Sequence, residues 1–217
     1  MSNAQSQALK STVAAVPVIP VIVIDDLTQA VPLARALVEG GLTVLEVTLR
    51  TPVALAAVSA IAAAVPGAIV GVGSVIDAKQ FASSASAGAT FAVSPGVTSE
   101  LIEAALAGSL PWLPAAQTVS EVLRLRAHGY DFLKFFPAES SGGLNFLRSL
   151  AGPVADVSFC PTGGIDALKA PNYLQLPNVR CVGGSWMCAP ALVQAGDWAE
   201  VTRRARAAVA LRQHASG

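Results

Sequence analysis

Three ionisable residues stand inside segments that otherwise have the composition of buried strands. Lys134 lies within FLKFFPAE, and Glu46 and Arg50 lie within VLEVTLR. Lysine is among the residues least often buried, because removing water from an ammonium group costs free energy unless the group is paired. Burial disfavours the charged form, and a neutral amine is a nucleophile that attacks a ketone to form a Schiff base. These residues therefore indicate covalent chemistry on a keto substrate.

A Schiff-base site also needs a group that moves protons and a cation that binds the charge of the substrate. Glu46 is a carboxylate in a low-dielectric setting, which suits acid/base catalysis. Arg50, further along the same strand, suits bidentate binding of a carboxylate. Alternatively, Lys134 and Glu46 form a structural ion pair, but desolvation makes such a pair a poor source of stability. We favour the functional interpretation, because perturbed titratable groups cluster at active sites.

The alternation of side chains along a strand predicts where these groups point. In VLEVTLR, Glu46 and Arg50 share one face, whereas the opposite face carries only leucine and valine. The apolar face must pack against helices, so Glu46 and Arg50 are expected to face the interior. In DFLKFFPA, Lys134 shares a face with Phe132 and Phe136. All three ionisable groups are therefore expected to converge.

The elements that position these side chains are short apolar strands alternating with alanine-rich helical segments. Helical patterns such as TPVALAAVSAIAAAV lie between most of the strands. This alternation predicts βαβ units and a parallel sheet. The segments with strand character are 16–24, 44–50, 68–75, 91–96, 110–116, 131–138, 156–164 and 179–186.

Eight such units predict an α/β fold, a (β/α)8 TIM barrel that forms a single domain over residues 1–217. A short leading helix is expected over residues 3–12. A doubly wound open sheet is the alternative, but that fold carries a glycine fingerprint after its first strand. Here the first strand is followed by DDL, without glycine. The barrel is therefore favoured.

Glycine pairs end the last two predicted strands, in PTGGI and VGGSW. In (β/α)8 enzymes the loops after strands seven and eight commonly bind a phosphate through backbone N–H groups, and glycine allows close approach. We therefore interpret the two pairs as a phosphate site rather than as simple strand exits. The segments GVGS and SPG, at the ends of the third and fourth strands, bring Ser74 and Pro95 toward the same mouth, where we expect both residues to bind substrate.

The composition narrows the class of protein. The 14 basic and 14 acidic residues balance, which excludes an electrostatic footprint for nucleic acid or for a membrane surface. The longest apolar run, residues 14–24, is shorter than the roughly 20 residues that span a bilayer, and its β-branched residues favour a strand over a signal peptide. The three cysteines lack CxxC spacing, which argues against a zinc site and favours a reducing compartment.

The segments LEVTLRT, FLKFFPAE, FCPTGGI and VGGSWM, in this order, resemble the family of 2-keto-3-deoxy-6-phosphogluconate (KDPG) and 4-hydroxy-2-oxoglutarate (KHG) aldolases. The similarity extends over essentially the whole chain. It implies a cytoplasmic class I aldolase, a lyase that forms a homotrimer and needs no cofactor and no metal. The resemblance also implies cleavage of a phosphorylated keto-sugar acid of the Entner–Doudoroff pathway to pyruvate and glyceraldehyde 3-phosphate.

The resemblance further implies roles for individual residues. Lys134 would form the Schiff base, Glu46 would act as the acid/base group, and Arg50 would hold the carboxylate of the pyruvyl group. Thr162 would help to line the pyruvyl pocket. The residues implied at the phosphate are Gly163, Gly164, Gly184 and Ser185.

Two segments depart from the usual pattern of the family. GVGS stands in place of GAGT, which introduces Val72 and Ser74, and LPAAQT changes residues 115–117. We expect both segments to lie near the substrate, so the preference among the gluconate, its galactonate epimer and unphosphorylated 4-hydroxy-2-oxoglutarate stays open. Two other functions also stay open: a non-catalytic phosphosugar-binding barrel, and a phosphosugar isomerase that uses Glu46 as a base.

Overall fold

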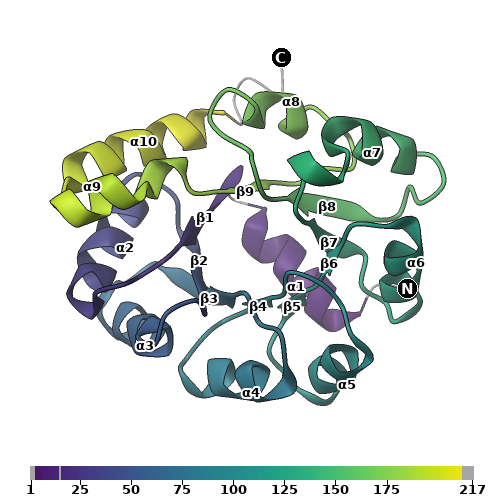
Figure 1. Ribbon diagram of the computed structural model, residues 1–217, viewed down its shortest axis with the longest axis horizontal. Coiled ribbons are helices and arrows are strands. Elements are labelled where there is room, and N and C mark those ends of the chain that lie inside the picture. The colour runs from purple at the N-terminus through teal and green to yellow at the C-terminus, as the bar shows by residue number, and fades with distance from the viewer. Residues whose placement is uncertain (1–2, 15, 212–217) are drawn as a thin grey trace.

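The computed structural model describes residues 3–14 and 16–211, which form an α/β fold built on a curled parallel sheet (Figure 1). The strands lie in the centre, and helices α2 to α10 surround them (Figure 1). The strands are β1 (Val18–Ile22), β2 (Val44–Thr48), β3 (Ile69–Gly73), β4 (Ala92–Val93), β5 (Trp112–Leu113), β6 (Ala115–Ala116), β7 (Phe132–Phe135), β8 (Ser158–Pro161) and β9 (Val182–Gly184). The α-helices are α1 (Ala4–Val13), α2 (Ala30–Glu39), α3 (Ala54–Ala64), α4 (Ala78–Ser86), α5 (Ser99–Ala107), α6 (Val119–Ala127), α7 (Gly143–Leu150), α8 (Ala170–Leu174), α9 (Pro190–Ala195) and α10 (Trp198–Ala210). Short 3-10 helices are η1 (Leu27–Gln29), η2 (Glu139–Ser141) and η3 (Trp186–Cys188).

The strands form two parallel sheets. The first has six strands in the order β5-β4-β3-β2-β1-β9, and the second has three in the order β6-β7-β8. Isolated parallel bridges join Phe159 to Val179 and Thr162 to Gly183, so β8 also contacts the segment that leads into β9. Parallel strands joined by helices confirm the predicted βαβ pattern.

The predicted single strand over residues 110–116 is wrong in detail, because Pro114 divides it. Trp112 and Leu113 pair with β4 in the first sheet, whereas Ala115 and Ala116 pair with β7 in the second. Proline has no N–H to donate to a ladder. Each of the other seven predicted segments contains one observed strand, and the predicted leading helix is α1.

The core has two parts that lie on opposite faces of the strands. The larger part packs the strands against the surrounding helices and includes Leu45 and Leu133. The smaller part is enclosed by the strands and contains Val44 and Phe132. The two neighbours in each strand therefore point to opposite sides, as the period of two predicted for VLEVTLR and DFLKFFPA requires.

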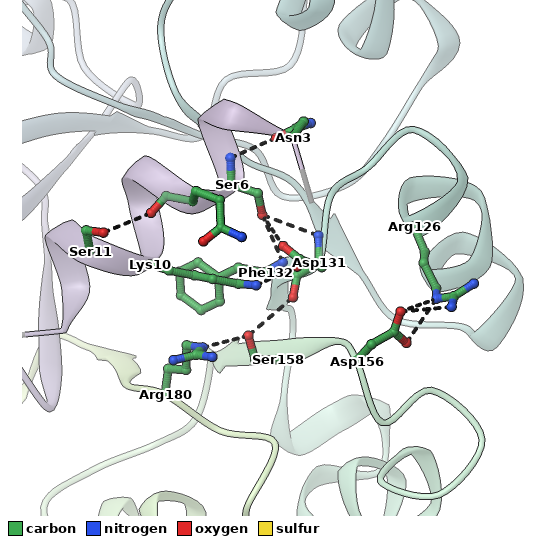
Figure 2. A network of polar contacts seen from close by, with 11 residues as sticks. Asn3, Ser6, Lys10, Ser11, Arg126, Asp131, Phe132, Asp156, Ser158 and Arg180 are labelled. Atoms are coloured by element: carbon green, nitrogen blue, oxygen red, sulfur yellow. Dashed lines mark hydrogen bonds and ion pairs between the residues drawn. The ribbon is translucent and has the colours of Figure 1, made fainter. Parts of the chain in front are cut away.

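Helix α1 packs into the enclosed core and is tied to the start of β7. Leu9 and Val13 belong to the enclosed cluster. The hydroxyl of Ser6 donates to Oδ1 of Asp131 at 2.7 Å and accepts from the N–H of Phe132 at 3.1 Å (Figure 2). Lys10 also pairs with Asp131 (Figure 2). A polar network thus ties α1 to the start of β7.

The network gives a prediction for stability. Ser6 is fully buried, so Ser6→Ala leaves the N–H of Phe132 without its acceptor. We expect the free energy of unfolding to fall by about 1–3 kcal/mol, measured by urea denaturation. Ser11 lies on the same helix but is exposed, and among the described residues its hydroxyl bonds only to the Gln7 carbonyl. Ser11→Ala is therefore the control, and an equal loss in both variants would contradict the prediction.

Within the described residues, no helix is long and apolar enough to cross a membrane. Cys160, Cys181 and Cys188 are all buried. Cys160 and Cys181 belong to the core cluster that the strands enclose. They occupy the positions of small apolar side chains there.

Candidate active site

A buried ion pair joins the two sheets. Nζ of Lys134, in β7, lies 3.0 Å from Oε1 of Glu46, in β2. The two residues are only 5% and 3% exposed, respectively. Nζ of Lys134 also lies 5.4 Å from the ring centroid of Phe136, within the range of a cation–π contact. The structure thus brings the two predicted catalytic residues together beside an aromatic ring.

This pair has a property that a catalytic amine requires. Burying two charges is expensive, and their attraction offsets that cost only with good geometry. A separation of 3.0 Å is a hydrogen-bond distance, so the carboxylate can accept a proton directly from the ammonium. The amine left behind is a nucleophile in a site from which water is largely excluded.

Glycine at two positions makes room for the functional side chains. A Cβ on Gly73, in β3, would overlap the carboxylate of Glu46. Similarly, a Cβ on Gly183, in β9, would overlap the side chain of Thr162. Any larger residue at these two positions would displace Glu46 or Thr162.

Lys134 lines a cavity of about 160 Å³ at the carboxyl ends of the strands. Other predicted residues that line it are Arg50, Thr162, Gly163, Gly164, Gly184 and Ser185. A larger groove of about 510 Å³ lies between α2 and α10, but the ionisable residues that line it are exposed. We assign the chemistry to the smaller cavity because it contains the buried ion pair's amine.

One wall of the cavity carries unpaired backbone donors. Gly163 and Gly164 have φ values of 106° and 75°, in the left-handed region that favours glycine. Within the described part of the chain, the N–H groups of Gly163, Gly164 and Ile165 donate no hydrogen bond. Successive free N–H groups in such a turn form an anion-binding concavity. This wall therefore suits a phosphate.

Arg50 and Ser74 contact each other at the mouth. Nε of Arg50 donates to the hydroxyl oxygen of Ser74 at 3.1 Å, which leaves the Nη groups of Arg50 for another acceptor. Ser74 has a φ of 62°, the single positive value among the described non-glycine residues. Backbone strain of this kind is concentrated at functional sites. The structure thus places Ser74 against Arg50 rather than in the cavity lining.

Several expectations about the surroundings of the site are not met. Val72 is fully buried in the core between strands and helices, so the expectation that it lies near the substrate is wrong. Gln117 is exposed and accepts a hydrogen bond from Ser141 at 3.2 Å, and residues 115–117 do not line the cavity. Pro95 follows β4 and does not line this cavity, so its role in substrate binding stays a prediction.

Sequence reasoning missed two residues of the cavity lining, Val21 and Ile165. Val21 pairs in register with Glu46 of the neighbouring strand, so it shares the inward face. Its position in an all-apolar run gave no sign of this. Among the described residues, no three His, Cys, Asp or Glu side chains are grouped so as to hold a metal ion.

Comparison with known proteins places this chain in a family. Residues 9–204 match the family model for aldolases described as KDPG and KHG aldolase. The chain belongs to the KDPG and KHG aldolase family. The 2-dehydro-3-deoxy-phosphogluconate aldolase of Pseudoalteromonas atlantica is 52% identical over 194 residues, or 89% of this chain and 90% of that relative. The KHG/KDPG aldolase of Escherichia coli K12 is 50% identical over 193 residues, or 89% and 91%.

Solved structures of KDPG aldolases share the fold. The Legionella pneumophila enzyme, with pyruvate captured as a covalent carbinolamine intermediate, has a TM-score of 0.90 and is 44% identical, covering 92% of this chain and 97% of that one. The Zymomonas mobilis ZM4 enzyme, with 3-phosphoglycerate, has a TM-score of 0.91 and is 45% identical, covering 95% and 97%. The KDPG and KHG aldolase fold thus extends over nearly the whole chain.

Proposed function

We propose that the chain is a class I aldolase that cleaves KDPG to pyruvate and glyceraldehyde 3-phosphate through a Schiff base on Lys134. One observation carries the proposal: the amine of the buried Lys134–Glu46 pair lines the same cavity as a glycine turn whose N–H groups are unpaired within the described residues. An amine and an anion site in one cavity suit a keto acid that carries a phosphate. The carbinolamine of the Legionella pneumophila relative and the 3-phosphoglycerate of the Zymomonas mobilis relative support it.

In the proposed reaction, Glu46 first accepts a proton from Lys134. The neutral amine attacks the C2 ketone, and Glu46 returns its proton to the hydroxyl of the resulting carbinolamine, which leaves as water to give a protonated imine and a free carboxylate. Glu46 then takes the proton of the C4 hydroxyl, the C3–C4 bond breaks, and its electron pair moves to the imine nitrogen as an enamine forms. Protonation of the enamine at C3 and hydrolysis of the imine release pyruvate and restore the amine.

The other lining residues would position the substrate. Arg50 would bind the carboxylate through its Nη groups, held at Nε by Ser74. Thr162 would line the pyruvyl pocket. The phosphate would bind at the glycine turns, with Gly163, Gly164, Gly184 and Ser185. Pro95 stays a predicted substrate-binding residue that would act from the rim.

Arg50→Lys is predicted to weaken substrate binding selectively. A lysine cannot form two parallel hydrogen bonds to a carboxylate, and hydrogen bonds to charged groups contribute about 1.5–3 kcal/mol. We expect KM to rise roughly 10- to 100-fold with a smaller change in kcat. Steady-state kinetics of pyruvate release would measure both constants. A fall in kcat alone would contradict a role in binding the carboxylate.

The proposal also covers the closure of the barrel and the assembly of the protein. We propose that residues 112–116 act as one strand shared by both sheets, and that the Thr162–Gly183 bridge completes a closed eight-stranded barrel. We also propose a homotrimer located in the cytoplasm, as the resemblance implies. Light scattering of the purified protein would measure the mass of the assembly.

Pyruvate release from three substrates tests the proposed reaction. We expect KDPG to be cleaved with the highest kcat/KM, ahead of its galactonate epimer and of unphosphorylated 4-hydroxy-2-oxoglutarate, with no loss on addition of a chelator. Binding without release of pyruvate would favour a non-catalytic barrel. Proton exchange without cleavage would favour an isomerase and would overturn the proposal.

A further inference from the structure

We infer that Glu139, Lys169 and Tyr173 are positioning residues that hold the Gly163–Gly164 turn in the shape that binds the substrate phosphate. This inference rests on the proposed function and concerns residues behind the cavity wall. Glu139 begins η2, just after the β7 strand that carries Lys134, and Lys169 and Tyr173 lie at the start of α8 and within it. Neither Lys169 nor Glu139 nor Tyr173 lines the cavity.

The three side chains form one connected cluster. Nζ of Lys169 donates to the carbonyl oxygen of Gly164 at 2.9 Å and lies 2.8 Å from Oε2 of Glu139. The hydroxyl of Tyr173 donates to the other oxygen, Oε1, of Glu139. Hydrogen bonds from Lys169 and from Tyr173 hold the pKa of Glu139 below its usual range. The hydrogen bond to Glu139 in turn raises the pKa of Lys169, so both groups are charged at neutral pH.

The turn itself lies directly on Glu139. A Cβ placed on Gly164 would fall 2.8 Å from Cγ and 2.9 Å from Cβ of Glu139, so only glycine allows this approach. The N–H of Glu139 donates to the carbonyl of Gly163 at 3.2 Å. The carbonyl oxygens of Gly163 and Gly164 therefore both accept hydrogen bonds from this cluster, the first from the N–H of Glu139 and the second from Nζ of Lys169.

Binding the carbonyls fixes where the N–H groups point. In a planar trans peptide the N–H points opposite to the carbonyl of the same unit. The carbonyl of Gly163 shares its peptide unit with the N–H of Gly164, and that of Gly164 shares its unit with the N–H of Ile165. These two N–H groups thus point away from Glu139 and Lys169. They are unpaired within the described chain and belong to residues that line the cavity.

A contribution to stability alone does not explain the cluster. The side chains of Lys169 and Glu139 are 46% and 35% exposed, and exposed ion pairs contribute little to stability. What the pair does determine is the orientation of two peptide units in the anion-binding wall. Loss of Lys169 would free the Gly164 carbonyl, and the turn could then rotate its N–H groups away from a phosphate.

Loss of the Lys169 side chain is therefore expected to lower catalytic efficiency mainly for the phosphorylated substrate. We expect Lys169→Met to lower kcat/KM for KDPG roughly 10- to 100-fold, mainly through KM, because small displacements of binding groups have effects of this size. Cleavage of unphosphorylated 4-hydroxy-2-oxoglutarate should change less than about two-fold, since its second carboxylate is bonded directly to C4 and ends short of the position that the phosphate on C6 of KDPG would reach. Lys169→Arg keeps a cation that reaches both partners and should restore most of the KDPG activity.

The experiment compares both substrates, and the inhibition constant of inorganic phosphate, in wild type, Lys169→Met and Lys169→Arg. Arg206→Met is the matched control, since it removes an exposed cation that pairs with Glu39 at 3.0 Å, far along the chain from the turn. We expect the KDPG-to-KHG activity ratio to fall, and the phosphate inhibition constant to rise, only in Lys169→Met. Equal loss on both substrates, or no change in either readout, would overturn the inference.

The same experiment separates this inference from the proposed function. If wild type cleaves neither substrate, the proposed function fails. Phosphate binding to wild type and Lys169→Met, measured by calorimetry, then still tests the turn. Equal affinities would overturn the positioning role, and weaker binding in Lys169→Met would support it.

Discussion

Lys134→Met is expected to abolish cleavage of KDPG, lowering kcat more than about 10⁴-fold. Methionine has a similar length but no amine, so neither the carbinolamine nor the imine can form. The remaining residues of the cavity could still bind substrate, and KM should change far less than kcat. Pyruvate release measured at high enzyme concentration would establish the size of the loss.

Loss of activity in Lys134→Met has to be distinguished from loss of the folded state. Methionine at this position leaves Glu46 buried without its partner, and breaking a buried pair costs about 3–5 kcal/mol when the remaining charge is uncompensated. The double variant Lys134→Met/Glu46→Gln removes that charge and should unfold at a higher temperature than the single variant. Activity within ten-fold of wild type in a folded Lys134→Met protein would contradict covalent catalysis.

Glu46→Gln should give the second largest loss, with kcat falling about 10²- to 10⁴-fold, the usual size of an acid/base contribution. The amide can still hydrogen-bond to Lys134 across the 3.0 Å gap, but it cannot accept the proton. Exchange of the methyl protons of pyruvate with deuterated water reports on enamine formation. NMR should show fast exchange in wild type and slow exchange in Glu46→Gln.

Glu46→Asp is a suitable companion variant. It keeps a carboxylate but draws it back from the amine by one methylene, so exchange should be intermediate between that of wild type and Glu46→Gln. An exchange rate in Glu46→Gln equal to that of wild type would assign the proton transfer to another group.

The central pair and the glycine turns were predictable from the sequence for physical reasons. The period of two along a strand placed Glu46 and Lys134 on inward faces, and the buried positions of Val44 and Phe132 confirm that alternation. A charge within an apolar strand needs a partner, which made the pair a clear signal. The glycine pairs stood out because they end successive strands.

Other features depend on contacts that no local pattern reveals. The change of sheet at Pro114 follows from which neighbours the flanking residues find, β4 on one side and β7 on the other. The Glu139–Tyr173 contact joins residues far apart in the chain. Val72 is a different case, because the same alternation that served for Glu46 predicts its outward position. A match to the family pattern says nothing about which face of the strand a residue occupies, whereas the period of two does.

Reductive trapping tests the central claim most directly. The purified protein is incubated with pyruvate, treated with borohydride, digested, and examined by peptide mass spectrometry alongside Lys134→Met. A Schiff base on Lys134 predicts a reduced pyruvyl adduct on the peptide that contains Lys134 in wild type, and no adduct in the variant. Folded wild-type protein without an adduct, or an adduct on a different lysine, would contradict the assignment of Lys134 as the nucleophile.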